Sequence, residues 1–260
     1  MRQLYIAGSG IKALSHLTLE TKKILLDSDR VLYLLNNKYM KEWVERQCQH
    51  SESLDGIYFS SEKRIDSYKE ISSYIINTYN KFKKTCVLMY GHPTVFASSA
   101  LWAAEEIRNS GGNVVILPGI SSLDCLFADL SIDPGDHGCF SVDATDFLIY
   151  NRVFDTRSHL VLWQAGSLGC FGQEKTTKID VLSDYLRKYY PDSHEVIIYE
   201  ASTYPSQAFK KEKSKLVDLC VDLFSSISTL YIPPLSKSFA DRDMVNSLGI
   251  NIENFVSDKV

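Results

Sequence analysis

Two side chains able to do acid–base and electrostatic chemistry, Arg64 and Tyr68, stand four residues apart in the sequence. A helix predicted over residues 64–83 places them on one face, because side chains at that spacing are neighbours on a helix surface. A guanidinium stays protonated and favours the ionised form of a nearby phenol, so Tyr68 is the candidate base of the pair. A solvated pair on a helix face also explains the spacing, and from the spacing alone that interpretation is favoured.

A second group of chemically useful residues, Tyr90-Gly91-His92-Pro93, follows an apolar run over residues 85–89. A helical pattern predicted over 95–108 comes next, which indicates a buried strand, a tight loop and a helix N-terminus. Open α/β sheets bind small molecules at the carboxyl ends of their strands, and glycine lets a ligand approach the backbone closely. The N–H groups of the next turn can hold a carboxylate. An ordinary strand–turn–helix corner is the alternative, with equal weight.

The first loop, Gly8-Ser9-Gly10, has the start of a dinucleotide-binding pattern but no third glycine at the required spacing. The position where an acidic residue would bind a ribose holds Asn36-Asn37 instead. A conventional dinucleotide site is therefore disfavoured, and a tight turn beside a sheet is the simpler interpretation.

The elements that must position these groups alternate between strand and helix in the first part of the chain. Strands are predicted at 4–7, 29–35, 85–89 and 114–117, and helices at 15–26, 38–48, 64–83 and 95–108. This alternation predicts an α/β domain over residues 1–118 with a mostly parallel sheet.

The second part of the chain predicts another α/β domain, over residues 119–235, with a mixed sheet. Strands are expected at 159–164, 195–199 and 227–232, an antiparallel strand at 208–213, a helix ending at 130 and another at 181–189. A glycine-rich polar loop is expected at 166–177, and a polar tail over 236–260 with one short helix at 241–248.

Composition restricts the class of protein. The 260 residues are 45% hydrophobic and carry a net charge of −4, which supports a full core and disfavours a nucleic-acid binder. The six cysteines and six histidines show no metal-ligand spacing, so we expect reduced thiols and no metal. Neither a signal-peptide core nor a membrane-length apolar run is present, which together with the cysteines predicts a cytoplasmic protein away from the membrane.

Four motifs together resemble one known family. They are Tyr5-Ile6-Ala7-Gly8-Ser9-Gly10, Tyr90-Gly91-His92-Pro93, Leu117-Pro118-Gly119-Ile120-Ser121-Ser122, and Ile227-Ser228-Thr229-Leu230-Tyr231-Ile232-Pro233-Pro234. Over nearly the whole chain this resembles the tetrapyrrole methylases, whose members use S-adenosylmethionine between two α/β domains. The resemblance implies that fold, with the cofactor in the cleft between the domains.

Within that family the borosin peptide backbone α-N-methyltransferases are the most similar. Three further motifs carry this likeness: Arg64-Ile65-Asp66-Ser67-Tyr68, Leu162-Trp163-Gln164 and Tyr199-Glu200-Ala201. The chain differs from the porphyrin branch, which usually has Asp at the position of His92.

The resemblance also implies a site, residue by residue. The catalytic group would be Arg64, Tyr68, Tyr90 and Tyr58, although the loop before Arg64 is shorter than the family pattern suggests. The cofactor contacts would be Tyr90, His92, Val95, Phe96, Ser121, Gln164, Ala201, Ser228 and Thr229. For His92 a loop-capping role is the alternative, for Gln164 a strand-end contact with solvent, and for Ser228 and Thr229 a sheet edge.

The implied reaction is repeated N-methylation of backbone amides in a ribosomally made precursor peptide, with S-adenosylhomocysteine as the product. An amide nitrogen is a poor nucleophile because its lone pair is delocalised, so its proton must be removed and the charge on oxygen stabilised. A tetrapyrrole C-methyltransferase and a non-catalytic S-adenosylmethionine-binding protein are the alternatives. The former predicts an acidic macrocycle as substrate and indifference to Arg64.

The expected partners are a separate precursor peptide and a second copy of the chain. The polar tail contains no Val/Ile-rich peptide, which predicts the split type of borosin system. Tyr68, Tyr74 and Tyr79 of the predicted helix suit a dimer interface with one wet end, or else pack within one chain.

Overall fold

The computed structural model describes residues 2–170, 175–236 and 240–251, which form two compact units. Unit 1 contains the chain up to Leu130 together with Ala201–Phe209, and unit 2 contains Ser131–Glu200 and the chain from Lys210 onward. The segment 119–130 therefore groups with the first unit. The division after residue 118 that the sequence suggested stays a prediction, as does the boundary at 235.

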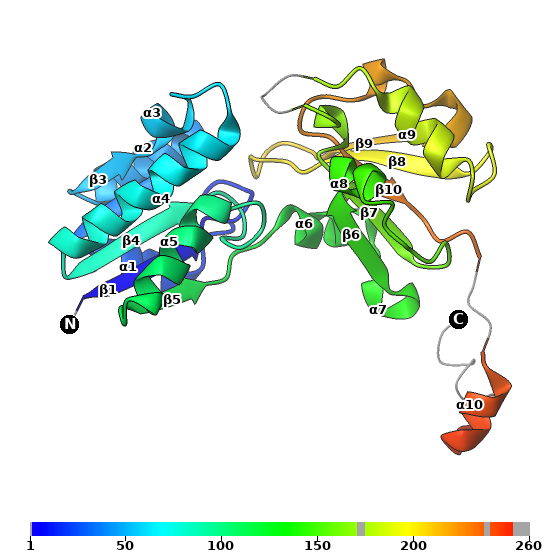
Figure 1. The fold of residues 1–260 in the computed structure, drawn as a ribbon, viewed down its shortest axis with the longest axis horizontal. Coiled ribbons are helices and arrows are strands. Elements are labelled where there is room, and N and C mark those ends of the chain that lie inside the picture. The colour runs from blue at the N-terminus through cyan, green and yellow to red at the C-terminus, as the bar shows by residue number, and fades with distance from the viewer. Residues whose placement is uncertain (1, 171–174, 237–239, 252–260) are drawn as a thin grey trace. The chain divides into compact units, whose positions relative to one another are not determined.

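Unit 1 is built on a five-stranded, all-parallel sheet with the order β3-β2-β4-β1-β5 (Figure 1). Its strands are β1 (Gln3–Gly8), β2 (Arg30–Leu34), β3 (Ser51–Ser53), β4 (Lys84–Met89) and β5 (Asn113–Leu117). The predicted parallel sheet is confirmed. The sequence did not predict β3, because three polar residues carry no apolar signal.

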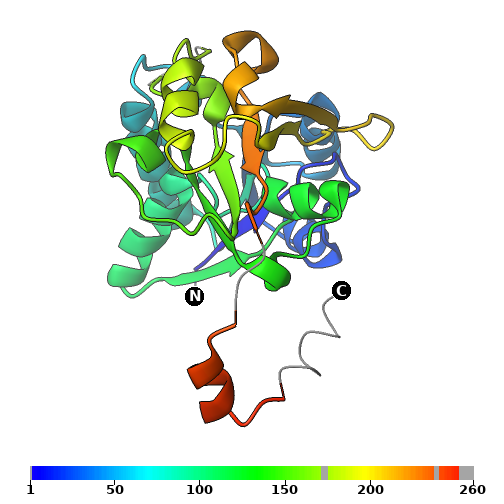
Figure 2. The same cartoon turned by 90° about the vertical axis from the view of Figure 1, so that its right-hand side faces the viewer.

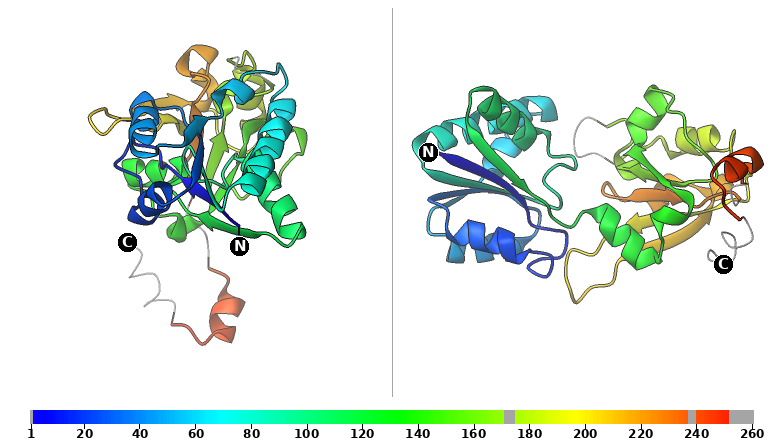
Figure 3. Two further views of the ribbon diagram at one scale, coloured as in Figure 1. Left: turned by 90° about the vertical axis from the view of Figure 1, so that its left-hand side faces the viewer. Right: turned by 90° about the horizontal axis from the view of Figure 1, so that it is seen from below.

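Helices cover both faces of this sheet, as the left view of Figure 3 shows. They are α1 (Leu19–Leu26), α2 (Lys38–Gln47), α3 (Asp55–Tyr58), α4 (Arg64–Lys81) and α5 (Ser98–Asn109), and unit 1 also contains α6 (Ser122–Leu130). Alternate residues of β1 enter two separate cores. Leu4 and Ile6 pack with apolar residues of α4 and α5, whereas Ala7 packs with those of α1 and α2. Burial on both faces explains the continuous apolar runs of the strands.

Two helix starts differ from the prediction. The helix expected from residue 95 begins at Ser98, because the Val95 N–H donates to the His92 carbonyl and Phe96 adopts a left-handed φ of 53°. The helix expected from residue 15 begins at Leu19, where the Thr18 hydroxyl caps it. Periodicity does not reveal turns of this kind, so both predicted helices were too long.

The tyrosines of α4 pack within the chain, which removes the argument that they form a dimer interface. Tyr79 lies in the core between α4 and α5, and Tyr74 packs against the same core. The Tyr74 hydroxyl donates to the Glu52 carboxylate at 2.7 Å. Tyr68 stacks on Tyr58.

Unit 2 contains the predicted mixed sheet, with the order β6-β7-β10-β8-β9. Its strands are β6 (Cys139–Asp143), β7 (His159–Trp163), β8 (Glu195–Glu200), β9 (Lys210–Lys215) and β10 (Thr229–Ile232). Only the β6–β7 pair is parallel, and β9 pairs antiparallel with β8 as expected. Because β10 runs opposite to β7 and β8, its start lies at the same edge of the sheet as their ends.

The helices of unit 2 are short, and α8 and α9 supply the main core on one face of its sheet (Figure 2). The α-helices are α7 (Pro134–His137), α8 (Ala144–Ile149), α9 (Ile179–Leu186) and α10 (Arg242–Ser247), and 3₁₀ turns cover Ala165–Ser167, Leu216–Asp218 and Val221–Leu223. Phe147 of α8 and Leu182 of α9 are fully buried against Leu160 and Leu230 of the sheet.

The connection from β8 to β9 belongs to unit 1. The Thr203 carbonyl accepts hydrogen bonds from the Ala13 N–H at 3.0 Å and from the Asn37 side-chain amide at 3.1 Å. Tyr204 makes an edge-on ring contact with Tyr39. Ala201, expected in the second domain, therefore lies at the start of a segment that packs with the first.

Parts of two predicted segments, residues 171–174 of the glycine-rich loop and 237–239 and 252–260 of the tail, lie outside the described residues. The six cysteines are free thiols. Among the residues that the structure describes, no helix combines the length and apolar character of a membrane span.

Candidate functional site

The strand-end loops of unit 1 approach one another backbone to backbone. A Cβ on Gly8 would lie 2.3 Å from the Gly91 carbonyl oxygen and 2.9 Å from Cα of Gly119. Gly10 and Gly91 also exchange backbone hydrogen bonds at 3.1 and 3.2 Å. The ends of β1, β4 and β5 thus meet only because glycine occupies each position. Small molecules bind at this edge of an open parallel sheet.

Tyr90 lies at this edge, where its N–H donates to the Leu34 carbonyl at 3.0 Å. Burial raises the pKa of its hydroxyl above the ordinary value of 10.0, with a smaller contribution from Cys125, while a hydrogen bond with Asn36 acts in the opposite direction. Tyr90 is therefore a neutral hydroxyl near neutral pH, with Asn36 as its polar neighbour. The sequence had singled out Asn36 only as the residue that replaces a ribose-binding acid.

One nitrogen of the His92 ring makes hydrogen bonds within its own loop. Its Nδ1 atom lies 3.3 Å from the Thr94 backbone nitrogen and 3.0 Å from the Thr94 hydroxyl. This is the loop-capping geometry considered as the alternative for His92. Val95 and Phe96 are exposed, at 39% and 50% of their surface, so their apolar side chains are available to a ligand.

Ser121 caps α6. Its N–H and hydroxyl both donate to the Asp124 carboxylate at 2.7 Å, and its hydroxyl accepts from the Asp124 N–H at 3.2 Å. The side chain is almost fully buried. The Ser121 hydroxyl is therefore engaged in capping the helix.

An aromatic group surrounds the start of α4. The rings of Tyr58 and Tyr68 stack with centroids 6.2 Å apart and an angle of 28°, and Trp102 of α5 meets Tyr68 edge-on at 6.3 Å. Burial raises the pKa of Tyr68 above 10.0, Tyr58 adds to that effect, and Arg64 opposes it. The guanidinium thus acts in the expected direction, but burial outweighs it. The structure brings together three of the four predicted catalytic residues, Arg64, Tyr68 and Tyr58.

In unit 2, Gln164 follows β7 with a left-handed φ of 53°. Non-glycine residues rarely adopt this conformation, and such strain concentrates at functional sites. Phe96 of unit 1 has the same φ, so two of the predicted cofactor contacts hold this strained conformation.

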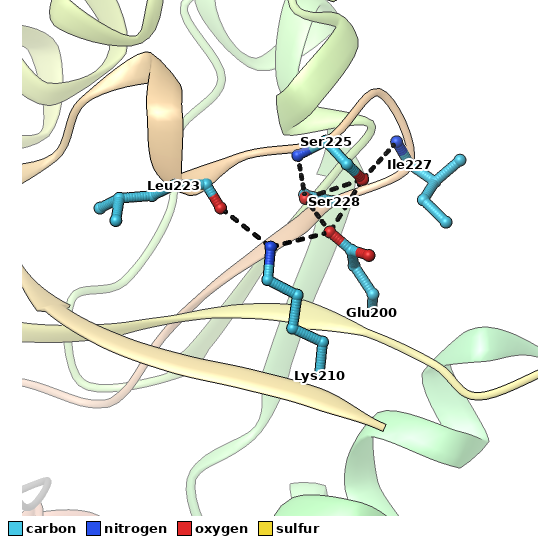
Figure 4. Close-up of polar contacts among 6 residues, drawn as sticks. All are labelled: Glu200, Lys210, Leu223, Ser225, Ile227 and Ser228. Carbon is cyan, nitrogen blue, oxygen red and sulfur yellow. Dashed lines mark hydrogen bonds and ion pairs between the residues drawn. The ribbon is translucent and has the colours of Figure 1, made fainter. Parts of the chain in front are cut away.

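Ser228 and Thr229 stand at the start of β10, beside the end of β8. The Ser228 side chain is fully buried, and its hydroxyl donates to the Glu200 carboxylate at 2.5 Å. Ser225 donates to the same oxygen at 2.8 Å, and the Lys210 ammonium lies 3.4 Å from it (Figure 4). Burial alone would raise the pKa of Glu200, but the two hydroxyls and the ammonium together lower it.

The described residues fit an adenosine-type cofactor in part. The glycine contacts of unit 1 bring backbone close to any ligand at that edge, and the neutral hydroxyl of Tyr90 and the side chain of Phe96 offer polar and apolar surface. No group of three or more His, Cys, Asp and Glu side chains is placed to hold a metal within the described part of the chain.

Sequence reasoning missed three contributors to these groups. Trp102 looked like an ordinary apolar residue of a helix. Asn36 was noted only because it replaces an acidic residue that would bind a ribose. Glu200 was noticed only as part of a family motif, because its partners lie 10 to 28 residues away in the chain.

Curated relatives are similar over most of this chain. A methyltransferase/ribosomally synthesized type I borosin cyclic peptide precursor of Gymnopilus junonius is 35% identical over 252 residues, covering 95% of this chain and 60% of that protein. A type I relative of Coprinopsis marcescibilis is 32% identical, and the match covers 95% of this chain and 67% of that protein. A type II relative of Phlebiopsis gigantea is 33% identical, covering 90% and 43%. The chain thus spans 43–67% of the length of these relatives.

Solved structures share the fold. Uroporphyrin-III-C-methyltransferase from Thermus thermophilus superimposes with a TM-score of 0.64 at 16% identity, covering 90% of this chain and 93% of that one. A form of that enzyme complexed with S-adenyl homocysteine superimposes with a TM-score of 0.62 at 17% identity, and the match covers 93% of this chain and 96% of that one. The model of the tetrapyrrole (corrin/porphyrin) methylases matches residues 3–217, and the chain belongs to that family.

Proposed function

We propose that this chain is an S-adenosylmethionine-dependent methyltransferase that N-methylates backbone amides of a ribosomally made peptide. The observation that carries the proposal is the group formed by Arg64, Tyr68 and Tyr58 around the start of α4. The relatives support it, since they are named both as methyltransferases and as borosin cyclic peptide precursors.

The chemistry of an amide requires both kinds of side chain in this group. Arg64 would stabilise the negative charge that develops on the amide oxygen, and Tyr68 would take the proton from the nitrogen. S-adenosylmethionine, when bound, supplies an electrophilic methyl group. Transfer of that methyl to the amide nitrogen would leave S-adenosylhomocysteine as the product, and the amide proton would end on the ionised oxygen of Tyr68.

Burial of Tyr68 sets the pH range in which this chemistry works. Its raised pKa keeps the phenol neutral near neutral pH, so only a small fraction is ionised and able to accept a proton. Tyr58 and Tyr90 would position the amide through their hydroxyls. Water exclusion by the surrounding rings, including Trp102, would strengthen the effect of Arg64 on the oxyanion.

The cofactor contacts that we propose are those of the family motifs. From unit 1 they are Tyr90, His92, Val95, Phe96, Ser121 and Ala201, and from unit 2 they are Gln164, Ser228 and Thr229. A separate precursor peptide as substrate, and a homodimer as the active form, complete the proposal. Both rest on the family resemblance.

The experiment is a methylation assay with purified protein, S-adenosylmethionine and a candidate precursor peptide, read by mass spectrometry. We expect a ladder of products one methylene apart, with the added mass on backbone amides in fragment spectra. Methylation of a tetrapyrrole with no change in the peptide would replace this proposal by the C-methyltransferase alternative.

Two binding measurements separate the parts of the proposal. S-adenosylhomocysteine at a hundredfold excess over its dissociation constant should raise the free energy of unfolding by about 2.7 kcal/mol. Ligand binding without turnover of any peptide would favour a non-catalytic role. Light scattering tests the dimer, and a pull-down with the precursor tests the separate substrate.

A further inference from the structure

We propose that Glu200 is a positioning residue, which holds the turn Ser225–Ser228 and thereby fixes the start of β10 and the loop after Gln164. This inference rests on the proposed function, because it takes Gln164, Ser228 and Thr229 as parts of the cofactor site. It also changes the expected role of Ser228, from a direct side-chain contact to a link in the support of the site.

One oxygen of the Glu200 carboxylate binds donors from two segments, the turn and the start of β9, as Figure 4 shows. Ser225 and Ser228 donate to it from the turn at 2.8 and 2.5 Å, and Lys210 approaches from the start of β9 at 3.4 Å. The Lys210 ammonium also donates to the Leu223 carbonyl at 3.2 Å, just before the turn. Charge-assisted hydrogen bonds of this kind are stronger than neutral ones.

Each of the two serine hydroxyls links the backbone of the turn to Glu200. The Ser228 hydroxyl accepts from the Ser225 N–H at 2.8 Å, and the Ser225 hydroxyl accepts from the Ile227 N–H at 3.3 Å. Each hydroxyl therefore accepts from the backbone of the turn and donates to Glu200. Because the Ser228 side chain is fully buried, its hydroxyl presents no surface to a ligand.

The turn Ser225–Ser228 also packs against the loop after Gln164 and holds it in place. A Cβ on Gly166 would lie 1.6 Å from the Ser225 carbonyl oxygen, so the two segments are packed backbone to backbone. The Gly166 N–H donates to the Ser228 carbonyl at 3.3 Å, and the Ser167 hydroxyl donates to the Ser226 carbonyl at 2.5 Å. A shift of the turn must therefore move the residues that follow the strained Gln164.

A second ion pair between the same two strands provides a matched control. Glu195 and Lys213 lie 2.6 Å apart at the other end of the β8–β9 ladder, with both side chains more than half exposed. Neither side chain reaches the turn. Loss of a carboxylate at Glu195 therefore removes an ion pair from the same hairpin without removing the support of Ser225 and Ser228.

The test compares Glu200→Ala, Glu200→Gln, Ser228→Ala and Glu195→Ala by two readouts. Hydrogen exchange of the ligand-free protein measures the turn itself. We expect Glu200→Ala to speed exchange of the amides of Ser225, Ile227, Ser228 and Gly166, Glu200→Gln to restore most of their protection, and Glu195→Ala to leave it unchanged. Unchanged exchange in Glu200→Ala would overturn the proposal.

The second readout is the dissociation constant of S-adenosylhomocysteine, measured by calorimetry on variants that retain the unfolding transition of a folded protein. We expect Glu200→Ala and Ser228→Ala each to weaken binding about tenfold, and the double variant to weaken it no further, as for residues that act through one link. Wild-type affinity in Glu200→Ala would overturn the proposal. If the wild-type protein does not bind the ligand, the proposed function fails, while the exchange measurement still decides the role of Glu200.

Discussion

The pKa values of buried oxygen groups at the candidate sites of the two units are shifted in opposite directions. In unit 1 burial raises the pKa of Tyr68 and Tyr90, and the polar neighbours Arg64 and Asn36 do not reverse it. In unit 2 burial acts on Glu200 in the same direction, but two serine hydroxyls and an ammonium reverse it. Desolvation is the largest single effect at all three residues, so the number of donors around each oxygen decides whether its pKa is raised or lowered.

This difference fits the two roles that we propose, a reacting group in unit 1 and a supporting group in unit 2. In the mechanism that we propose, the small ionised fraction of the Tyr68 phenol takes a proton from the substrate, whereas the Glu200 carboxylate, bonded by several donors, holds neighbouring segments in place. The contrast predicts that substitutions in the first group alter turnover and those in the second alter binding and stability.

The largest effect should come from removing the reacting groups. We expect Arg64→Ala and Tyr68→Phe each to slow methylation about 10²–10⁴-fold, because they remove an oxyanion donor and a base, while cofactor affinity changes little. Mass spectrometry of the peptide measures the rate. Tyr74→Phe on the same helix is the matched control, since its hydroxyl bonds Glu52 and should be dispensable for turnover. Near-normal rates in both variants would show that the group has another role.

The state of Tyr68 should appear in the pH dependence of the rate. Because its folded pKa is raised above 10.0, the ionised fraction grows throughout the neutral and mildly alkaline range. We expect the single-turnover rate to rise about tenfold per pH unit over this range, with no plateau below pH 10. A plateau near neutral pH would contradict the role of a buried phenol as base. Circular dichroism at each pH checks that the fold is intact.

Glycine contacts at the strand ends should be equally essential in both units. Gly8→Ala places a Cβ 2.3 Å from the Gly91 carbonyl oxygen, and Gly166→Ala places one 1.6 Å from the Ser225 carbonyl oxygen. We expect each to destabilise the protein by about 1–3 kcal/mol or more in urea unfolding, through overpacking of backbone. Gly56→Ala, where a Cβ meets nothing within 4 Å, is the control and should not destabilise. Equal stability of all three variants would show that the loops can separate freely.

The smallest effect concerns the charge of Glu200. Its folded pKa is lowered from 4.5, so it contributes stability that is present above about that pH and lost as the pH falls. We therefore expect the wild-type protein to lose more free energy of unfolding than Glu200→Gln does between pH 6 and pH 3, as measured by urea titrations (roughly the window in which a carboxyl titrates). Glu195→Gln tests an exposed ion pair in the same hairpin, which should matter less. Parallel curves for wild type and Glu200→Gln would contradict the hydrogen-bonded state of the carboxylate.

The sequence predicted the local elements and the helix that carries two of the candidate catalytic residues. Apolar runs at residues 4–7 and 85–89 became central strands, because a parallel sheet buries both of its faces. The four-residue spacing of Arg64 and Tyr68 placed them on one helix, α4. These features depend on the repeat of side-chain positions along a helix or strand, and that repeat can be recognised in the residues of a short segment alone.

Only the tertiary structure placed residues that are distant in the chain. It stacked Tyr58 on Tyr68, joined Glu200 to Ser225 and Ser228, and packed Gly166 against the same turn. It also determined that the helix after Tyr90 begins at Ser98 and that Gln164 adopts a left-handed conformation. Such contacts depend on strand order and on loops that approach across a sheet edge, and no local spacing encodes these. The sequence therefore determined which elements form and which residue types could react, whereas the packing of strand ends decided which of these residues lie together and in which direction the pKa of each is shifted.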